Sequence, residues 1–576
     1  MWTVSVEATI YNGPGPAATG PERRLQVLRI SQLNLHPGHS PEELTDKICK
    51  SLRIRRADLL NYEIQKQSID ARKKPDIFFS YTVDVKVKDE RQVLRKSRGR
   101  AAKTDRISYQ LPSSGTVPLV YRPIIVGSGP AGLFCGYLLA KSGYAPVILE
   151  RGNPVEERLK DVEEFWKTGN LNLSSNVQFG EGGAGTFSDG KLNTLVKDKK
   201  GRSRFVLQTF VDHGAPADIL YEQKPHIGTD ILTDIVKNMR HSIRNMGGEF
   251  RFQSQMTDIK MKNISRVDGK HDEIAKCIGS VVLDSGEEID TNVCVLALGH
   301  SARDTFQMLY ARQIPMEAKS FAVGVRIEHP QSMITRSQYG KTTYSGLPAA
   351  SYKLTAKLKN KRGAYTFCMC PGGYVVNASS EEKRLAVNGM SYHQRDGINA
   401  NSAVVVTVTP EDYKSTGPLS GIEFQRMLEE CAYKEGKGRV PVQCFEDFRK
   451  NRPTVKLGNV VPQIKGDFTL ANVRKIFPKE LGDSLEEGIL LMDDKIHGFA
   501  EADAVLSGVE SRTSSPVKIL RGPDFESTVS GLYPCGEGAG YAGGITSAAM
   551  DGIKTAEAII KKYSQKLNIT APVHEF

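Results

Sequence analysis

The sequence predicts an α/β protein in which a dinucleotide-binding domain carries an inserted, mostly β domain and follows a small N-terminal α/β domain. Three observations support this fold class. A glycine-rich strand–turn–helix begins at Arg122, strand and helix patterns continue to residue 317 and resume after residue 500, and residues 318–500 are rich in β-branched runs. Strands that alternate with helices are typical of a parallel sheet covered by helices. A chain of 576 residues is long enough for two or three domains.

The strand–turn–helix has the form of a complete dinucleotide-binding fingerprint. Residues 124–126 are a short apolar strand, and Gly127-Ser-Gly-Pro-Ala-Gly132 follows at once. Gly127 permits the tight turn, Gly129 has no Cβ to block a pyrophosphate, and Gly132 lets the helix pack closely on the strand. Pro130 suits the first helical turn, where its missing N–H costs nothing. We therefore expect the helix N-terminus to face phosphates.

A second strand, residues 146–149, ends in Glu150. This carboxylate falls about 20 residues after the glycines, where dinucleotide-binding units place the acid that binds ribose hydroxyls. A carboxylate there would also repel a 2′-phosphate. The fingerprint thus predicts a dinucleotide without such a phosphate, and an empty α/β domain with a structural turn is the alternative.

A second glycine-rich segment, Gly180-Glu-Gly-Gly-Ala-Gly185, follows polar residues and lacks a βαβ frame. We interpret it as part of a loop, 180–192, that lines the same cavity. Its glycines allow close approach to a ligand, and Ser188, Asp189 and Lys191 offer polar groups to a cofactor or a substrate. A surface loop without function is the alternative.

Residues 1–95 are predicted to form the small α/β domain. Ser40-Pro-Glu-Glu43 has the form of a capping box that opens a helix. The expected strands are 4–10, 25–30 and 77–87, and the expected helices are 40–52 and one that begins near Arg56. Residues 96–118 are predicted to be a basic linker, because Lys and Arg alternate with Ser, Gly and Ala from 91 to 106 without an apolar period. A nucleic-acid-binding arm is the alternative.

Composition narrows the class of protein. A hydrophobic fraction of 39% with 25% charged residues is typical of a soluble globular protein. No apolar run approaches the roughly 18 to 20 residues that span a bilayer, and residues 1–10 lack the features of a secretion signal. We therefore predict a cytoplasmic protein without membrane contact. The nine cysteines include no Cys-x-x-Cys pair, which favours reduced thiols and predicts no metal site.

Later segments look like the continuation of the dinucleotide-binding domain. A helix is expected over 228–246 and strands over 247–253, 277–283 and 293–298, the last of which ends at Gly299. Near the C-terminus, residues 531–538 lead through glycines to a helix from about Ile545 to Lys561. The glycines at 536, 538, 540, 543 and 544 leave a backbone that can lie against a flat ring.

With these segments in view, the chain resembles the FAD-dependent oxidoreductases of the glutathione-reductase-like superfamily. It is most similar to the poorly characterised bacterial-type NAD(FAD)-utilizing dehydrogenases, over nearly its whole length. The strings 224–230, 367–373 and 510–516 carry this closer resemblance. It implies a Rossmann-like FAD-binding domain made of residues 119–317 and 501–576, with residues 318–500 as the inserted substrate or cap domain.

The resemblance also implies roles for single residues. The fingerprint glycines would surround the FAD pyrophosphate, and Glu150 would bind the adenosine ribose. Gly536-Glu537 resembles a Gly-Asp pair whose carboxylate binds the ribityl chain or a phosphate, and Ala297-Leu-Gly299 resembles an Ala-Thr-Gly strand end with leucine in place of threonine. The dipole of the helix that begins at Ile545 would stabilise the negative charge of a reduced flavin. The expected cofactor-binding residues are Gly127, Ser128, Gly129, Pro130, Ala131, Gly132, Glu150, Arg151, Gly182, Gly183, Lys191, Gly299, Gly536, Glu537, Gly543, Gly544 and Ile545.

The predicted function is an FAD-dependent oxidoreductase that passes a hydride or an electron pair between the flavin and a small organic substrate. The sequence has no second βαβ fingerprint for NAD(P)H, so either NAD(P)H docks transiently or the substrate itself donates the electrons. One alternative is an RNA-modifying or RNA-binding flavoprotein, prompted by the net charge of +12. A second is a non-catalytic module that holds FAD as a structural ligand.

No residue is assigned to proton transfer from the sequence. His300 and Arg303 are expected near the flavin by their position after the Gly299 turn. His300 is a candidate proton donor or acceptor, with a structural role as the alternative. Arg512 is a candidate for binding an anionic substrate together with Ser514 and Ser515, and a solvated loop is the alternative. Cys368 and Cys370 are expected on one face of a strand, either as core thiols or in a redox role that faces the flavin.

Overall fold

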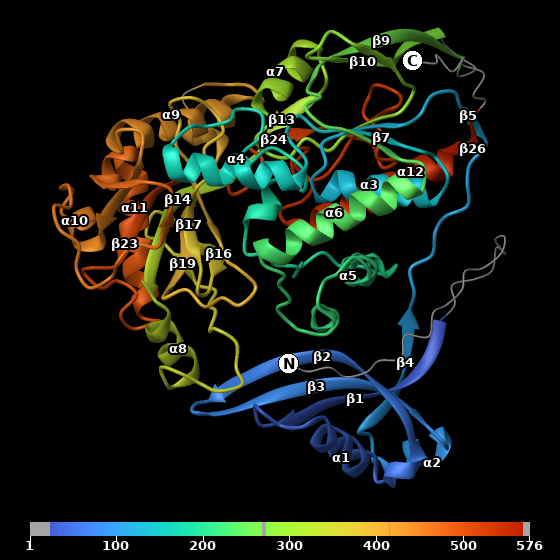
Figure 1. The fold of residues 1–576 in the computed structure, drawn as a ribbon, viewed down its shortest axis with the longest axis vertical. Helices are drawn as coiled ribbons and strands as arrows, with labels where there is room; N and C mark the ends of the chain where they lie inside the picture. The colour runs from blue at the N-terminus through green and yellow to red at the C-terminus, as the bar shows by residue number, and fades with distance from the viewer. Residues whose placement is uncertain (1–23, 268–271, 414, 568–576) are drawn as a thin grey trace.

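The computed structural model describes residues 24–267, 272–413 and 415–567. Figure 1 shows three regions: an N-terminal sheet at the bottom, a parallel-sheet region with helices at the upper right, and a region built on a second large sheet at the left. The predicted α/β class is confirmed. The strand expected over residues 4–10 lies outside the described residues.

A five-stranded parallel sheet forms the centre of the dinucleotide-binding domain, in the order β25-β12-β6-β7-β8. Its strands are β6 (Ile124–Val126), β7 (Val147–Leu149), β8 (Glu249–Arg251), β12 (Cys294–Leu296) and β25 (Leu532–Pro534). Successive side chains alternate between two cores, so that Ile125 and Ile148 belong to one and Ile124 and Leu149 to the other. Both faces are covered, which explains why these strands are apolar throughout.

Helices cover one face of this sheet, and strands with one helix cover the other (Figure 1). The helices are α3 (Pro130–Lys141), α5 (Arg202–Asp212), α6 (Thr229–Asn245) and α12 (Ile545–Lys562). The opposite face carries β9 (Met256–Val267), β10 (Asp272–Leu283), β11 (Glu288–Asp290) and α7 (Arg303–Ala311). Helix α4 (Val155–Thr168) instead packs most of its apolar side against the inserted region. Helix α12 lies directly on α3, because a Cβ added at Gly552 would come 2.1 Å from the carbonyl oxygen of Ala131.

The N-terminal domain is a four-stranded antiparallel sheet in the order β2-β3-β1-β4. Its elements are β1 (Arg24–Leu35), α1 (Pro41–Leu52), β2 (Leu59–Lys73), β3 (Asp76–Val87), α2 (Glu90–Lys96) and β4 (Ala101–Ile107). The capping box at Ser40 is confirmed, since the Ser40 hydroxyl accepts from the Glu43 N–H and the Glu43 carboxylate accepts from the Ser40 N–H. The helix expected from Arg56 is wrong. Only a 3₁₀ turn, Arg56–Asp58, precedes the long strand β2.

The basic segment expected as a linker is folded over much of its length. Strand β4 pairs in register with β1 from Arg24↔Ile107 to Ile30↔Ala101, so the N-terminal sheet runs past the predicted boundary at residue 95. Carboxylates from neighbouring elements pair with its cations, Arg106 with Glu63 and Lys103 with Glu90. The prediction failed there because a charged edge strand has little apolar alternation.

The inserted region is built on a seven-stranded sheet in the order β15-β16-β19-β14-β23-β20-β22. These strands are β14 (Phe321–Pro330), β15 (Thr355–Lys357), β16 (Gly363–Cys370), β19 (Asn399–Val408), β20 (Val440–Cys444), β22 (Phe468–Leu470) and β23 (Val505–Glu510). A small sheet packs beside them: β17 (Tyr374–Asn377), β18 (Val387–Met390) and β21 (Ile464–Lys465). The surrounding helices are α8 (Gln331–Tyr339), α9 (Ser420–Glu435), α10 (Phe445–Arg449) and α11 (Lys479–Asp493). Within the described ranges, no helix combines the length and the apolar character that crossing a membrane requires.

The chain enters and leaves the inserted region through two adjacent strands. Strand β13 (Met316–Ala318) pairs antiparallel with β24 (Val517–Ile519). Strand β23 lies between β14 and β20 in the large sheet, although the boundary predicted at residue 500 assigned it to the dinucleotide-binding domain. A second pair, β5 (Val117–Leu119) with β26 (Tyr563–Leu567), joins the segment before β6 to the segment after α12 in the dinucleotide-binding domain.

Candidate functional site

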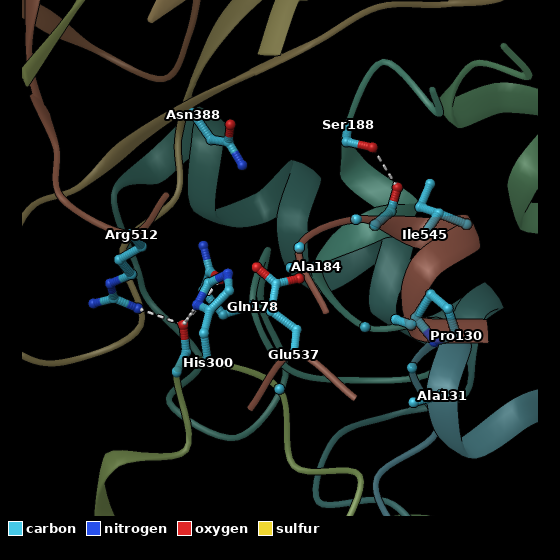
Figure 2. Close-up of a pocket in the computed structure, with 18 of the residues that line it drawn as sticks. Pro130, Ala131, Gln178, Ala184, Ser188, His300, Asn388, Arg512, Glu537 and Ile545 are labelled. Carbon is cyan, nitrogen blue, oxygen red and sulfur yellow. Dashed lines mark hydrogen bonds between the residues drawn. The ribbon is translucent and has the colours of Figure 1, made fainter. Parts of the chain in front are cut away.

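A cavity of about 490 Å³ lies where the carboxyl ends of β6, β7 and β12 meet the inserted region (Figure 2). This is the edge at which open parallel sheets bind their ligands. Its wall runs from Glu150 and Arg151 past the fingerprint to Ile545 at the start of α12, and it continues to Cys368 and Arg395 in the inserted region. Two domains therefore share one binding site.

The fingerprint forms a cradle without side chains in this wall. Gly127 has φ +100°, and a Cβ there would come 2.4 Å from the carbonyl oxygen of Ala297. A Cβ at Gly132 would come 1.9 Å from the carbonyl oxygen of Gly127, so this glycine lies behind the wall and lets α3 pack against the turn. At Gly129, by contrast, the nearest described atom would be the Gly183 Cα at 3.7 Å. The open space at Gly129, together with the free N–H groups at the start of α3, fits a diphosphate.

Glu150 lies on the cavity wall, and its carboxylate already accepts four hydrogen bonds. Oε2 accepts from the N–H and the hydroxyl of Ser128, at 3.0 and 2.6 Å. Oε1 accepts from the N–H groups of Gly152 and Gly180, at 3.1 and 3.0 Å. A carboxylate has about four sites that accept hydrogen bonds, so these four bonds occupy all of them. Glu150 therefore ties three loops together, a role that the sequence did not indicate, and its contact with a ribose stays a prediction.

Arg151 lies beside Glu150 in the same wall. Its guanidinium donates to both carboxylate oxygens of Asp304, at 3.0 and 2.9 Å, and stacks on the ring of Phe179 at 4.4 Å. Both contacts fix the Arg151 side chain in the cavity wall at the end of β7. The structure thus places Arg151 at the cavity, held by a carboxylate from α7.

The glycine-rich loop lines the cavity opposite the fingerprint. Gly183 has φ +64°, and a Cβ there would come 3.0 Å from the Gly129 Cα, so the two loops approach backbone to backbone. Gly182 lies behind the surface, where a Cβ would come 2.1 Å from the Thr186 hydroxyl oxygen. Glycine is required at both positions because neither the φ angle nor the space admits a side chain.

A buried arginine that the sequence analysis missed holds this loop in place. Arg158 of α4 donates to five carbonyl oxygens, those of Asn176, Val177, Gly180, Glu181 and Gly183, at 2.7 to 3.2 Å. Its burial lowers the pKa of the guanidinium to about 10. No sequence signal identifies such a residue, because an arginine on an amphipathic helix is usually exposed.

The start of α12 forms the opposite part of the wall. Ile545 and Ala548 line the cavity with Gly543 and Gly544, where an added Cβ would meet no described atom within 4 Å. Gly299 is equally open and has φ +70°. Gly536 lies behind the wall, since its Cβ would come 2.7 Å from the Ala131 Cβ. The two helix N-termini, at Pro130 and Ile545, thus border one cavity with glycines before each (Figure 2).

Ionisable side chains face the cavity beside these glycines. Burial raises the pKa of Glu537 to about 7, against the opposing effect of the Lys319 ammonium. Burial, reinforced by Arg512 and Arg303, lowers the pKa of His300 to about 3, so its imidazole is neutral at neutral pH. Figure 2 shows both side chains close to Gln178. A carboxyl that titrates near pH 7 is suited to hold and release a proton.

Arg303 and Arg512 meet at one buried carboxylate. Each guanidinium donates to both oxygens of Glu429, at 2.7 to 2.9 Å. Arg512 reaches the cavity and also donates to the hydroxyl groups of Ser301 and Ser380, whereas Arg303 lies behind the wall. The sequence placed both arginines near the site but missed Glu429, which neutralises part of their charge.

Lys191 connects the glycine-rich loop to the inserted region. Its ammonium contacts the carbonyl oxygen of Met369 and lies 3.6 Å from the Asp189 carboxylate, which also pairs with Arg395. Burial acts to raise the pKa of Asp189, but these two cations outweigh it and hold that pKa below its usual value. Lys224 and Lys353 line the same end of the cavity, which therefore carries a net positive charge. In the part of the chain that the structure describes, no three His, Cys, Asp or Glu side chains are arranged to hold a metal ion.

Three family models match parts of the chain. Residues 320–513 match the model described as "FAD-dependent protein, C-terminal domain-like", and residues 125–155 match an NAD(P)-binding Rossmann-like domain. Residues 27–86 match a domain of unknown function, DUF8436. An uncharacterized protein of Clostridium beijerinckii is 49% identical over 543 residues, which are 93% of this chain and 99% of that protein.

Two solved enzyme structures show distant likeness to this chain. The L-proline dehydrogenase from P. horikoshii is 12% identical over 78% of this chain and 94% of its own, with a TM-score of 0.32. The flavin-dependent brominase Bmp2 is 13% identical over 76% of this chain and 78% of its own, with a TM-score of 0.34. Likeness at this level transfers no activity to the present chain.

Proposed function

Because this chain belongs to the family of the Clostridium beijerinckii protein and its cofactor is FAD, we propose that it transfers a hydride or an electron pair between FAD and a small organic substrate. The matches to the FAD-dependent C-terminal domain and to the Rossmann-like domain agree with FAD-dependent oxidoreductase chemistry. The transfer step, the substrate and membership of the glutathione-reductase-like superfamily are part of the proposal. The observation that carries it is the cavity between two helix N-termini, which the open glycines Gly129, Gly543 and Gly544 precede.

The residues of the wall divide into those that bind and those that act on protons. Gly129, Ser128 and the first turn of α3 would hold the diphosphate, as their open backbone and the helix dipole allow. The start of α12 and the loop 183–191 would hold the ring, with the glycines at 543 and 544 in contact with it. FAD supplies the redox chemistry when it is bound. Glu537 would hold a proton at its carboxyl, and Lys191 and Arg395 would orient an anionic group of the substrate.

The absorbance spectrum of the purified protein tests the proposal directly. We expect bands near about 370 and 450 nm, the ordinary signature of an oxidised flavin. Anaerobic addition of NADH and of NADPH then tests whether a nicotinamide donor reaches the ring. Rapid loss of the 450 nm band with either one supports transient docking, and a stable band with both supports a substrate that donates the electrons itself. A colourless protein that binds NAD in place of FAD contradicts the proposal.

The variant Glu537→Gln is expected to flatten the pH dependence of the flavin reduction potential near pH 7. The carboxyl, whose pKa lies at about 7, loses its proton as the pH rises through this range. The resulting carboxylate opposes the added charge of a reduced flavin. The wild-type potential should therefore fall more steeply with pH there than that of the permanently neutral variant, by on the order of 30 mV per pH unit. Dye-equilibrated redox titrations between about pH 6 and about pH 9 measure both.

The exposed residue Glu317 on β13 provides a matched control. Its strand pairs with β24, which hydrogen-bonds to Ala539 close to Glu537, but Glu317 lies outside the cavity wall. Glu317→Gln should leave the potential and its pH dependence unchanged. Identical slopes for the wild type and Glu537→Gln would show that this carboxyl does not exchange a proton when the flavin is reduced.

A further inference from the structure

Two cysteines lie at an irregular point of β16 beside the cavity. The pairing of β16 with β19 steps from Phe367↔Ala403 to Cys370↔Asn401, so one extra residue bulges out between them. Cys368 sits in this bulge with φ +43°, a conformation that non-glycine residues rarely adopt. Bulges of this kind redirect a side chain and are frequent next to active sites. Here the redirected residue, Cys368, lines the cavity.

The two thiols interact with each other and with nearby cations. The Cys370 Sγ lies 3.2 Å from the carbonyl oxygen of Cys368, to which it donates a hydrogen bond. Arg326 donates to the same oxygen at 2.7 Å, and the Lys191 ammonium contacts the carbonyl oxygen of the intervening Met369. The hydrogen bond from the Cys370 thiol, then Lys191 and Arg326, lower the pKa of Cys368, whereas burial raises the pKa of Cys370. Cys368 is therefore the more acidic thiol of the pair.

No other cysteine of the chain shares these properties, and all nine lie in the described ranges. Cys368 is the only one of the nine that lines the cavity. Burial is the main influence that raises the pKa at Cys49, Cys135, Cys294, Cys431, Cys444 and Cys535. The combination of a strained backbone, adjacent cations, a second thiol and access to the cavity occurs at one place. Reactive cysteines are found in such electropositive, partly accessible settings.

We propose that Cys368 and Cys370 form a redox-active pair that exchanges two electrons with the flavin. In the oxidative direction, the Cys368 thiolate and the Cys370 thiol join in a disulfide bond. The two electrons and the thiol proton are taken up by oxidised FAD, so that charge and atoms balance. In the other direction, the reduced cofactor returns the two electrons and the proton, and the disulfide bond opens. This inference rests on the proposed function, because FAD is the electron partner.

The tryptic peptide 363–383 allows the pair to be followed by mass spectrometry, since it contains Cys368 and Cys370 and no other cysteine. The full-length holoprotein is treated under mild oxidation with diamide, unfolded, alkylated with iodoacetamide and digested. We expect this peptide to lose two hydrogens and to resist alkylation, so that the oxidised chain has two fewer free thiols than the nine of the reduced chain. After reduction with dithionite, both of its cysteines should be alkylated.

An anaerobic dithionite titration tests the exchange with the flavin. The oxidised wild type should take up about twice as many electron equivalents per flavin as Cys370→Ser, because a disulfide and a flavin each accept an electron pair. The matched control is Cys431→Ser, which removes a half-buried thiol on α9 outside the cavity and should titrate like the wild type. The peptide measurement on the wild type remains decisive if Cys370→Ser does not fold.

The outcomes separate this inference from the proposed function. A yellow protein whose peptide stays fully alkylated after oxidation, or whose wild type and Cys370→Ser take up equal electron equivalents, overturns the cysteine pair and leaves the flavoprotein proposal standing. A colourless protein overturns the proposed function, and the electron exchange with it. A yellow protein with both the peptide disulfide and the doubled uptake supports the pair.

Discussion

The variant Gly129→Asp is expected to fold normally but to bind FAD at least about 100-fold more weakly, a loss of roughly 2.7 kcal/mol. Gly129 is the N-cap of α3 with φ −70°, a conformation open to any residue. A Cβ added there would meet no described atom nearer than the Gly183 Cα at 3.7 Å, and the position opens into the cavity, so the folded chain can admit a side chain. The carboxylate would, however, occupy the diphosphate cradle and repel the negative charge that the helix N-terminus attracts.

This variant separates cofactor binding from stability, because the two should change in opposite directions. Aspartate is a better N-cap residue than glycine, and it should stabilise α3 by roughly a few tenths of a kcal/mol relative to the wild-type Gly129. Equilibrium dialysis or fluorescence titration with FAD measures the affinity, and urea unfolding of the FAD-free protein measures the stability.

The other end of the same helix offers a control. Gly143 follows α3 in the left-handed region at φ +79°, is exposed, and would place a Cβ near no described atom within 4 Å. Gly143→Asn should keep both the fold and the affinity for FAD, because asparagine tolerates this conformation better than other side chains. If Gly129→Asp retained FAD as tightly as Gly143→Asn, the diphosphate would not lie at the fingerprint.

Local sequence patterns predicted the parts of the site that depend on neighbouring residues. The glycines at 127, 129 and 132 could be predicted because each is needed for a separate steric reason. The order of strand, turn and helix in the sequence fixes where they lie. The start of α12 after Gly544 was predicted for the same reason. The glycines that the sequence pattern groups together nevertheless occupy different positions relative to the cavity. Gly132, Gly182 and Gly536 lie behind the wall, where they allow close packing, because a sequence pattern does not tell which side of a loop faces a ligand.

Long-range ionic contacts could not be predicted from the sequence. Glu429 lies on α9 and binds Arg303 of α7 and Arg512 after β23, residues that are far from it in the chain. Arg158 and Glu150 likewise act on loops that are remote in sequence. The contact of Glu429 with Arg303 depends on how the inserted region packs on the dinucleotide-binding domain, whereas those of Arg158 and Glu150 depend on how loops pack within that domain. Strand β4 could not be predicted for a similar reason. Its pairing with β1 determines its structure, and its charged composition gives no strand pattern in the sequence.

The variant Glu429→Ala is expected to destabilise the folded chain by about 3 to 5 kcal/mol, the range for a buried ion pair that loses one partner. The Glu429 side chain is fully buried, and those of Arg303 and Arg512 are 1% and 5% exposed. Alanine would leave Arg303 with Glu381 as its carboxylate partner and Arg512 without one at this position. It would also remove the acceptor of the Ser511 hydroxyl. Urea unfolding monitored by circular dichroism measures the loss.

The adjacent residue of α9 provides the comparison. Glu430 pairs with Arg384, and its side chain is 44% exposed, so Glu430→Gln should change the free energy of unfolding by less than about 1 kcal/mol. Equal effects of Glu429→Ala and Glu430→Gln would mean that the buried cluster does not connect α7, α9 and the segment after β23. A larger loss for Glu429→Ala would locate the connection between the two domains at this carboxylate.

The same cluster predicts how stability depends on acid. Burial alone would raise the pKa of Glu429, but Arg303 and Arg512 outweigh it and hold that pKa well below its ordinary value. A carboxyl whose pKa is depressed in the folded state stabilises that state above its unfolded pKa of about 4.3, and the contribution is lost as the pH falls through the folded value. The free energy of unfolding of the wild type should therefore fall below about pH 4, whereas Glu429→Gln, which cannot ionise, should lack this part of the decline. Identical acid profiles of the two proteins would contradict an ionised Glu429 in the folded chain, and a flatter profile for Glu429→Gln would show that the charge of Glu429 stabilises the folded chain.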